Sequence, residues 1–446
     1  FAKIAVDPRP YQLVPLLMAL RQEFVRLLIA DDVGIGKTVE AALIAKELIE
    51  RGEVTGLAVL CPPHLAEQWQ RELERKFHIS AELVLSSTVN RLLKNVQPGQ
   101  PFFERYPFVV VSTDYIKSPL HRDEFIRSCP DLVIVDEAHT CTLAGGIGKS
   151  KQERFNLIQR IAADKRRHMI LVTATPHSGN EAAFRSLLSL LDEKFADLPE
   201  DIEAESRSAL REQLARHLVQ RLRGNVIEQD KKLGIDTQFP DRIDTEVGYK
   251  LTKEYRGLFD RVLDFVNELV GDDTGTHRVR RVRWWSALAL LRAMASSPAA
   301  GAATLRQRAK PPEDRDGSAP ADVADIDATG REAVFDETDD EATEALDRVG
   351  GADVYDESAP ASDRLKRLAR DTEALRGKGD AKLKKLVEIL KSLLEERADR
   401  DPAAHSPIVF CRFIDTAEYV AEELRKSLKG VEIAAVTGRL PPEERE

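Results

Sequence analysis

The sequence predicts an α/β fold built around a parallel sheet. Short, continuous apolar runs alternate with helical patterns through residues 1–200, and polar motifs follow several runs directly. Continuous apolar runs are typical of strands that are buried on both faces, and their alternation with helices is typical of a sheet covered on both sides. Because such sheets bind ligands at the carboxyl ends of their strands, we expect the motifs to meet at one edge. The apolar runs are residues 27–30, 57–61, 108–111, 132–135 and 169–172.

A glycine-containing loop follows the first apolar run. Its sequence is Asp-Asp-Val-Gly-Ile-Gly-Lys-Thr, residues 31–38, and a helical pattern follows from Val39 to Ile49. A glycine loop between a strand and a helix wraps backbone N–H groups around phosphates, while its lysine reaches the β and γ oxygens and its hydroxyl binds Mg²⁺. A strict phosphate loop has glycine at the first position, where this chain has Asp31.

An acidic motif, Asp-Glu-Ala-His at residues 136–139, ends the run 132–135. There Asp136 can hold a metal ion, and Glu137 can orient and deprotonate a water molecule. Taken alone, the pair could be a solvated strand end. Together with the lysine loop it predicts a nucleoside triphosphatase that uses ATP and Mg²⁺.

Four motifs carry a family resemblance: Pro10-Tyr11-Gln12, the loop 31–38, Asp-Glu-Ala-His, and Thr-Ala-Thr-Pro-His-Ser-Gly at 173–179. They resemble those of the superfamily-two helicase-like ATPases, in particular the Swi/Snf-type translocases of double-stranded DNA. Within that family the chain is similar to the bacterial branch that includes the RNA-polymerase-associated recycling ATPases, and to the Swi/Snf-like helicases of DISARM-type phage defence. The resemblance implies RecA-like lobes, and it explains Asp31, because an acidic residue replaces the first loop glycine in this family.

The resemblance also implies roles for residues at matching positions. Catalysis is assigned to Lys37, Asp136 and Glu137, and the metal to Thr38 and Asp136. Coupling between the state of the bound nucleotide and DNA binding is assigned to His139, Thr173, Ala174 and Thr175. The residues assigned to DNA are Pro62, His64, Gln68, Ser112, Thr113 and Asp114. The residues assigned to ATP are Tyr11, Gln12, Asp32, Gly34, Ile35, Gly36, Lys37, Thr38 and Val39.

The chain divides into four predicted regions. Residues 1–200 form the ATP-binding lobe, which ends with a helix from Glu181 to Leu191. Residues 201–311 are mainly helical, 312–363 are an acidic and disordered insert, and 364–446 are a connecting helix and the first part of a second RecA-like lobe. In that last part we expect strands at 406–413 and 431–436 and helices at 378–394 and 416–428. The resemblance implies that an arginine-containing motif of this lobe would follow Glu446, so the 446-residue chain should bind ATP but hydrolyse it poorly, and the full-length protein should be active.

Charge and composition constrain the partners. The chain has a formal net charge of −10. The acidic insert holds 18 Asp or Glu and three Arg, a local charge of −15, which leaves +5 for the rest. The insert is either a solvated spacer or an arm that competes with DNA for a basic groove. The four cysteines are scattered, and Cys61 and Cys411 lie in strand-like apolar runs, where we expect buried free thiols. A reducing cytoplasm fits this pattern, and no apolar run is long enough to cross a membrane.

Two arginine-containing strings have functions that the sequence leaves open. The string at 277–285 has four arginines, among them Arg278 and Arg281, beside two tryptophans. It is either an amphipathic helix with a solvated cationic face or a helix that contacts phosphates. The string at 218–223 resembles the arginine-bearing linker of the family, but Gln220 departs from the usual pair of arginines, so a role for Arg221 stays open.

The sequence thus predicts an ATP-dependent motor that tracks along duplex DNA, with other proteins of a defence or transcription complex as partners. Two other classes are possible. A strand-separating RNA or DNA helicase shares the Asp-Glu-Ala-His motif, and a non-enzymatic scaffold could retain a nucleotide-binding lobe.

Overall fold

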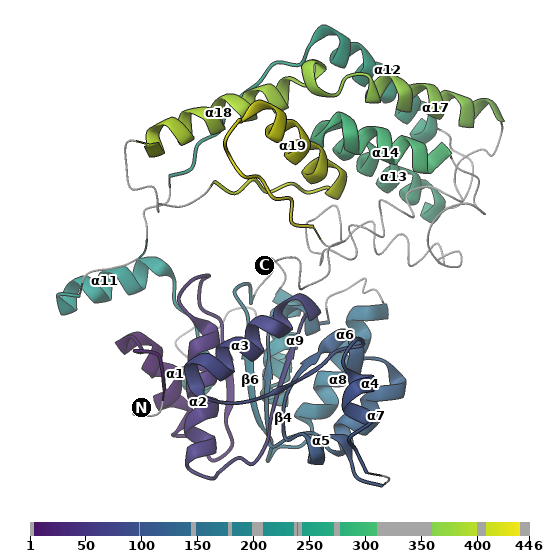
Figure 1. The fold of residues 1–446 in the computed structure, drawn as a ribbon. Coiled ribbons are helices and arrows are strands. Elements are labelled where there is room, and N and C mark those ends of the chain that lie inside the picture. The colour runs from purple at the N-terminus through teal and green to yellow at the C-terminus, as the bar shows by residue number, and fades with distance from the viewer. Residues whose placement is uncertain are drawn as a thin grey trace. The chain divides into compact units, whose positions relative to one another are not determined.

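The computed structural model describes most of the chain as two compact units, residues 1–242 and 243–446. The first is an α/β unit, and the second is helical in its described residues (Figure 1). The described residues are 4–97, 99–143, 149–176, 181–198, 208–235, 239, 243–271, 277–309, 359–398 and 407–437.

A parallel sheet of seven strands forms the centre of the first unit, in the order β3-β4-β2-β5-β6-β1-β7. All five predicted strands are present, so the predicted fold class is confirmed. The sequence missed β3 and β7, which have three and two residues and lie at the edges of the sheet. The strands are β1 (Arg26–Ile29), β2 (Leu57–Cys61), β3 (Glu82–Val84), β4 (Phe108–Ser112), β5 (Leu132–Val135), β6 (His168–Val172) and β7 (Leu218–Val219).

Two hydrophobic cores cover the two faces of the sheet. Alternate strand residues point to opposite faces, so Leu28 packs in one core and Leu27 and Ile29 pack in the other. The core with Leu27 contains α1 (Leu13–Ala19), α2 (Lys37–Glu50) and α3 (Ala66–Phe77). The core with Leu28 contains residues of α4 (Val89–Leu93), α5 (Phe102–Arg105), α6 (Thr113–Ile116), α7 (Pro119–Arg127), α8 (Lys149–Ala162), α9 (Glu181–Ser189) and η4 (Glu193–Asp197).

Further elements complete the first unit. They lie beside strand ends or after β6, and η3 also contributes Ala138 and Cys141 to the core with Leu28. They are η1 (Pro10–Gln12), η2 (Pro63–Leu65), η3 (Ala138–Cys141), α10 (Ser208–Ala215) and α11 (Arg223–Leu233). The helix predicted from Val39 begins two residues earlier, at Lys37, and the helix predicted at 181–191 ends at Ser189.

The described part of the second unit is built from packed helices. Buried apolar residues of α12 recur at three- and four-residue spacing and pack with α13, α14 and α17, which fits the helical region predicted at 201–311. The helices predicted at 378–394 and 416–428 are also present. The helices are α12 (Lys253–Gly271), α13 (His277–Ser296), α14 (Pro298–Ala309), α17 (Ala359–Glu373), η7 (Gly377–Gly379), α18 (Ala381–Ala398) and α19 (Ile414–Ser427).

The strands predicted at 406–413 and 431–436 were wrong. Residues 407–413 and 431–436 belong to no strand, and Ile408 and Phe410 are 75% and 91% exposed. A strand is stabilised by the ladder that it forms with a neighbour, and no described segment of this unit supplies one. Apolar composition alone therefore does not produce a strand here.

Three further predictions concerned the acidic insert, the cysteines and membrane-spanning segments. The predicted acidic insert lies outside the described residues, apart from its last five, which belong to the start of α17. Cys61 and Cys141 are buried free thiols, whereas Cys411, predicted to be buried in a strand, is only half-buried. Within the described ranges, no helix is long and apolar enough to span a bilayer.

Candidate nucleotide-binding site

The glycine loop connects β1 to α2 and depends on two residues with left-handed backbone. Gly34 has φ +85° and Gly36 has φ +107°, a region that side chains with a Cβ rarely adopt. A Cβ placed on Gly36 would lie 2.4 Å from Nε2 of Gln12. Glycine at 36 is therefore required by both backbone conformation and space.

The tight approach at Gly36 arises because η1 packs on the loop. Gln12 Nε2 donates a 2.9 Å hydrogen bond to the carbonyl of Ile35, and the Tyr11 hydroxyl donates a longer one, 3.4 Å, to the same oxygen. Gln12 Oε1 in turn accepts from the backbone N–H of Arg9. Tyr11, Gln12 and Ile35 are all buried, so the structure brings these three predicted ATP residues together.

Lys37 and Asp136 both lie at the carboxyl edge of the sheet, after β1 and β5, which are separated by β6. Lys37 Nζ donates to the carbonyls of Asp31 and Asp32 at 2.9 and 3.3 Å. Burial raises the pKa of Asp136, and the positive charge of Lys37 opposes that rise. The lysine loop and the acidic motif, 99 residues apart in the sequence, therefore meet in one site.

Two hydrogen bonds fix the carboxylate of Asp136. The indole N–H of Trp69, on α3, donates to Oδ2 at 2.7 Å, and the backbone N–H of Glu137 donates to Oδ1 at 2.9 Å. Glu137 itself has φ +47°, an uncommon conformation for a non-glycine residue and one that marks strained functional segments. Its side chain is 37% exposed and hence open to water. Trp69 had no predicted role, although the sequence shows a tryptophan on the helix after β2.

A polar bridge joins the acidic motif to the end of β6. His139 Nδ1 lies 3.0 Å from the Thr173 hydroxyl and 3.2 Å from Glu137 Oε2. Thr173 Oγ1 also accepts from the backbone N–H of Thr175 at 3.1 Å. Three of the four residues predicted to couple nucleotide state to DNA thus form one connected group, and Ala174 lies within the same turn.

A buried ion cluster that was not predicted lies beneath the loop. Asp31 and Glu40 are 0% exposed, and Arg221 forms ion pairs with both. Its guanidinium also donates to the carbonyl of Tyr11. Burial and the neighbouring carboxylate of Asp31 raise the pKa of Glu40. Asp31 and Arg221 are 190 positions apart, so no sequence spacing could reveal this pairing.

The residues present fit Mg²⁺ and a nucleotide triphosphate. Mg²⁺ is commonly held by one or two protein ligands together with substrate phosphates, without an all-protein cage. Among the described residues, no group of three or more His, Cys, Asp or Glu could hold a metal by itself. Thr38, on the first turn of α2, and Asp136 are suitable oxygen ligands. The left-handed glycines allow close approach of backbone to phosphate.

The residues predicted to contact DNA have different environments. His64 and Gln68, in η2 and α3, are exposed, and Pro62 is half-buried. Ser112 and Thr113 are 3% and 4% exposed, and their hydroxyls bond within the first unit, to the Tyr115 N–H and the Cys61 carbonyl. The side chains of Ser112 and Thr113 are therefore not available to a ligand in this structure, contrary to expectation.

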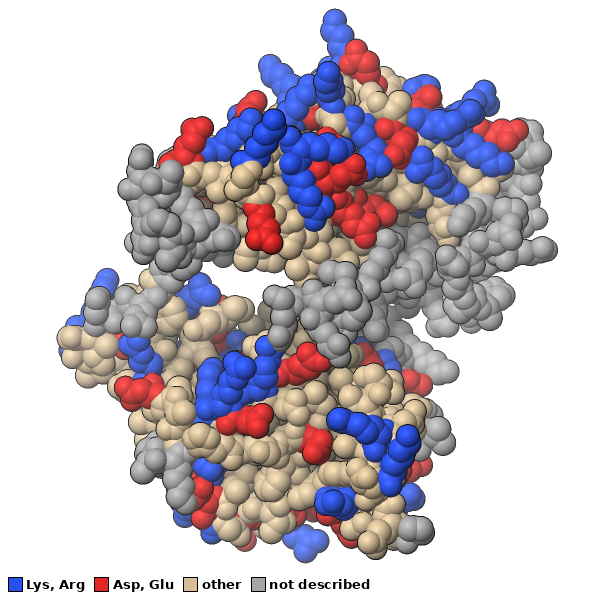
Figure 2. Space-filling model, in the orientation of Figure 1, with Lys and Arg blue, Asp and Glu red and all other residues tan. Residues whose placement is uncertain are grey.

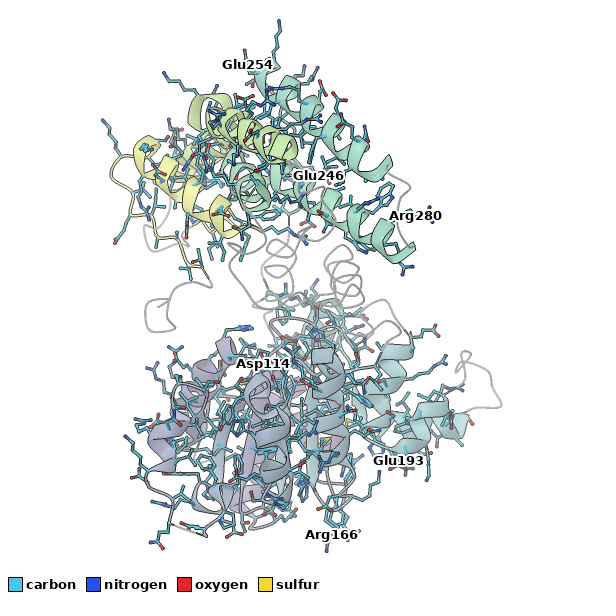
Figure 3. The ribbon with its side chains drawn as sticks, turned by 90° about the vertical axis from the view of Figure 1, so that its right-hand side faces the viewer. Asp114, Arg166, Glu193, Glu246, Glu254 and Arg280 are labelled. Atoms are coloured by element: carbon cyan, nitrogen blue, oxygen red, sulfur yellow. The ribbon has the colours of Figure 1, made fainter. Side chains whose placement is uncertain are left out.

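Asp114 is occupied by two cations. Burial raises the pKa of its carboxyl, but the hydrogen bonds and charges of Lys117 and Arg154 outweigh that effect and lower the pKa. The ion pairs have N–O distances of 2.7 and 2.8 Å. Asp114 lies near the carboxyl edge of the sheet, at the opposite end of the first unit from Arg166 (Figure 3).

The basic string 277–285 forms the first half of α13. Arg281 and Trp284 are exposed, but Arg283, expected on the solvated face, is only 8% exposed. The side chain of Arg278 lies outside the described residues. Elsewhere on the second unit, Lys and Arg side chains gather on one face together with Asp and Glu (Figure 2). The face that Figure 2 shows is therefore mixed in charge rather than uniformly basic.

A parallel sheet with a glycine-lysine loop after one of its strands is the framework of the P-loop α/β proteins, and this is the class of the first unit. The chain belongs to the family described as the SNF2-related domain, which matches residues 11–298. The family resemblance predicted from the four motifs is therefore confirmed.

Curated relatives match part of the chain. YqhH of Bacillus subtilis (strain 168), described as an uncharacterised ATP-dependent helicase, is 34% identical over 185 residues, 41% of this chain and 29% of that protein. The RNA polymerase-associated protein RapA of Photobacterium profundum is 28% identical over 202 residues, 45% of this chain and 20% of RapA. The matched part is thus less than a third of the length of either relative.

Solved structures also resemble the chain. The SWI2/SNF2 ATPase core of Sulfolobus solfataricus, in complex with dsDNA, aligns with 96% of this chain and 71% of its own, at 15% identity and a TM-score of 0.42. The Hef helicase domain of Pyrococcus furiosus aligns with 98% and 82%, at 17% identity and a TM-score of 0.45.

Proposed function

We propose that the protein is an ATP- and Mg²⁺-dependent motor that moves along double-stranded DNA. The observation that carries the proposal is that Lys37 and Asp136 follow the carboxyl ends of β1 and β5, two strands separated only by β6 in the sheet. A phosphate-binding lysine and a metal-binding carboxylate in one site are what ATP hydrolysis needs. Membership of the SNF2-related domain family supports the same function.

Each residue of the site has a distinct chemical task in this proposal. Lys37 and the loop N–H groups bind the phosphates, and Thr38 and Asp136 hold Mg²⁺, which when bound neutralises charge on the transferred phosphoryl group. Glu137 is partly exposed and held beside Asp136, so it can orient the attacking water and accept its proton. Gln12, which the resemblance assigns to ATP, holds η1 against the loop through its hydrogen bond to the carbonyl of Ile35.

Coupling of hydrolysis to movement is assigned to the bridge from Glu137 through His139 to Thr173. A change at the γ-phosphate position that moves Glu137 would reach the end of β6 through two short contacts. His64 and Gln68 are exposed near the start of α3, on the segment that we expect to face the DNA backbone. Phosphate recognition predicts that affinity is largely independent of sequence and falls steeply with salt.

A strand-separating helicase is the second candidate, favoured by the description of YqhH as an ATP-dependent helicase. The two candidates differ in their preferred nucleic acid. Binding of the chain to a labelled duplex, a single DNA strand and an RNA of equal length would separate them, because the proposed motor prefers the duplex. For the proposed motor, we also expect partner proteins from a defence or transcription complex.

The nucleotide site is tested by two substitutions. Lys37→Ala should abolish most of the binding of a fluorescent ATP analogue, because the main phosphate charge partner is lost. Glu137→Gln should keep binding and abolish turnover in the complete protein as its gene encodes it, since an amide cannot accept the proton. The control is Arg166→Gln, a substitution at an 84% exposed side chain at the far end of the first unit (Figure 3). Wild-type affinity in Lys37→Ala would contradict the proposed site.

A further inference from the structure

The chain segment that follows β7 runs beside the glycine loop. Strand pairing between β1 and β7 gives backbone hydrogen bonds from the N–H of Leu28 and Ala30 to the carbonyls of His217 and Val219, at 2.8 and 2.7 Å. The pattern continues beyond both strands, because the N–H of Asp32 donates to the carbonyl of Arg221 at 3.0 Å. The first half of the loop is therefore bonded to residues 219–221 as if the sheet extended into it.

The side chain of Arg221 strengthens this attachment. Its guanidinium bonds to both carboxylate oxygens of Asp31, to Glu40 and to the carbonyl of Tyr11. Among the residues that the structure describes, no other cation forms an ion pair with either carboxylate. Two fully buried carboxylates without a cation are strongly destabilising, so Arg221 holds η1, the start of the loop and α2 in one arrangement.

The next helix is attached to the same loop. Arg223, the first residue of α11, donates from Nε to the carbonyl of Val33 at 2.7 Å. Farther along α11, Val226 is 1% exposed and packs in a small cluster with Tyr11 and Ile35. Helix α11 is thus hydrogen-bonded to the first half of the loop, at Val33, and packed against the second half, at Ile35.

We propose that Arg221 is a positioning residue that ties the phosphate-binding loop to α11, so that the occupancy of the loop determines the stability of that helix. This inference rests on the proposed function, because it takes the loop to bind ATP. Arg221 itself has its guanidinium in the ion cluster and acts through Asp31 and the loop backbone. In the sequence, α11 is the last described helix before the second unit begins at residue 243. A change in the stability of α11 therefore acts on the segment that leads to that unit.

The test is amide hydrogen exchange of the 446-residue chain with and without Mg²⁺ and the non-hydrolysable analogue AMP-PNP. In wild type, the analogue should slow exchange in the loop 31–36 and also in α11, residues 223–233. Arg221→Lys keeps a positive charge beside Asp31 and Glu40, but an ammonium cannot reproduce the forked hydrogen bonds. It should keep protection of the loop, lose most of the protection of α11, and bind the analogue about tenfold more weakly, the effect of roughly one lost charge-assisted hydrogen bond.

A second variant keeps the inference testable if Arg221→Lys does not fold. Arg223 is only partly buried, so Arg223→Gln should fold as wild type and reduce the protection of α11 while leaving that of the loop unchanged. Arg166→Gln is the control for both.

The outcomes separate the two proposals. If wild type does not bind AMP-PNP, the proposed function fails. If it binds and protects the loop while exchange in α11 is unaffected, or if both arginine variants retain full protection of α11, then the role assigned to Arg221 is refuted and the proposed function stands. A uniform loss of protection and of thermal stability in Arg221→Lys, with unchanged α11 coupling in Arg223→Gln, would reduce Arg221 to a structural ion pair.

Discussion

Replacing Gly36 with alanine tests the geometry of the phosphate-binding loop directly. Gly36 precedes α2 with φ +107°, and an added Cβ would lie 2.4 Å from Gln12 Nε2, far inside van der Waals contact. The left-handed backbone costs an alanine about 1–2 kcal/mol. Relief of the clash requires Gln12 to move and give up its hydrogen bond to Ile35, which costs about another 0.5–1.5 kcal/mol. We therefore expect Gly36→Ala to lower the free energy of unfolding by roughly 1.5–3.5 kcal/mol.

Gly52 provides a matched control because it isolates the backbone contribution. It has φ +72°, and no atom lies within 4 Å of a Cβ placed on it. Gly52→Ala should therefore cost only the left-handed backbone energy, about 1–2 kcal/mol, and leave nucleotide binding unchanged. Gly36→Ala displaces the loop that holds the phosphates, so its affinity for a fluorescent ATP analogue should fall about tenfold or more, equivalent to about 1.4 kcal/mol.

The assays are urea unfolding and fluorescence titration of both alanine variants. The double variant Gln12→Ala/Gly36→Ala completes the cycle, because without the Gln12 side chain the clash disappears and the cost of Gly36→Ala should fall to that of Gly52→Ala. Wild-type nucleotide affinity in Gly36→Ala, or an equal cost of the substitution with and without Gln12, would refute the reasoning.

Two further predictions concern buried hydrogen bonds in the first unit. Trp69→Phe removes the indole donor to Asp136 and should lower the free energy of unfolding, measured in urea, by about 1.5–3 kcal/mol. The control Trp284→Phe, at a 55% exposed side chain, should change that free energy by less than about 0.5 kcal/mol. Equal effects of the two substitutions would exclude a special role for the Trp69 indole. His168 accepts from the Val25 N–H through Nδ1, and burial lowers its pKa below the usual value. The unfolded state therefore binds the proton more readily, so stability is fully present above about pH 6.5 and is lost as the pH falls toward the folded-state pKa. His168→Asn keeps a hydrogen-bond acceptor but does not titrate. Between pH 7.5 and 5, values that bracket the unfolded pKa of about 6.5, its urea midpoint should therefore fall less than that of wild type. Urea midpoints that fall equally with pH in both proteins would contradict this.

Local patterns were sufficient to predict the strands and motifs of the first unit. The five central strands are buried on both faces, so they must be continuously apolar, and this property is visible in the sequence. The strand before Asp136 and the helix that begins at Lys37 were located in this way. The edge strands β3 and β7 were missed because strands of three and two residues are too short to show a pattern.

Long-range pairings were not predictable from the sequence. Arg221 and Asp31 are 190 positions apart, and Trp69 and Asp136 are 67 apart, so only the folded sheet brings them together. The predicted strand at 406–413 was wrong for a related reason. A strand needs a neighbour for its hydrogen bonds, and an apolar segment such as the one around Phe410 contains no information about whether that neighbour is present.

The sequence alone determined which residues could bind a phosphate and a metal ion, because glycine conformation, side-chain charge and strand burial are local properties. The tertiary structure decided how those residues are held: Gln12 against Gly36, Trp69 on Asp136, and Arg221 between Asp31 and Glu40. These contacts join segments that meet only when the sheet forms, since buried charges and donors take whichever partner the fold brings within reach.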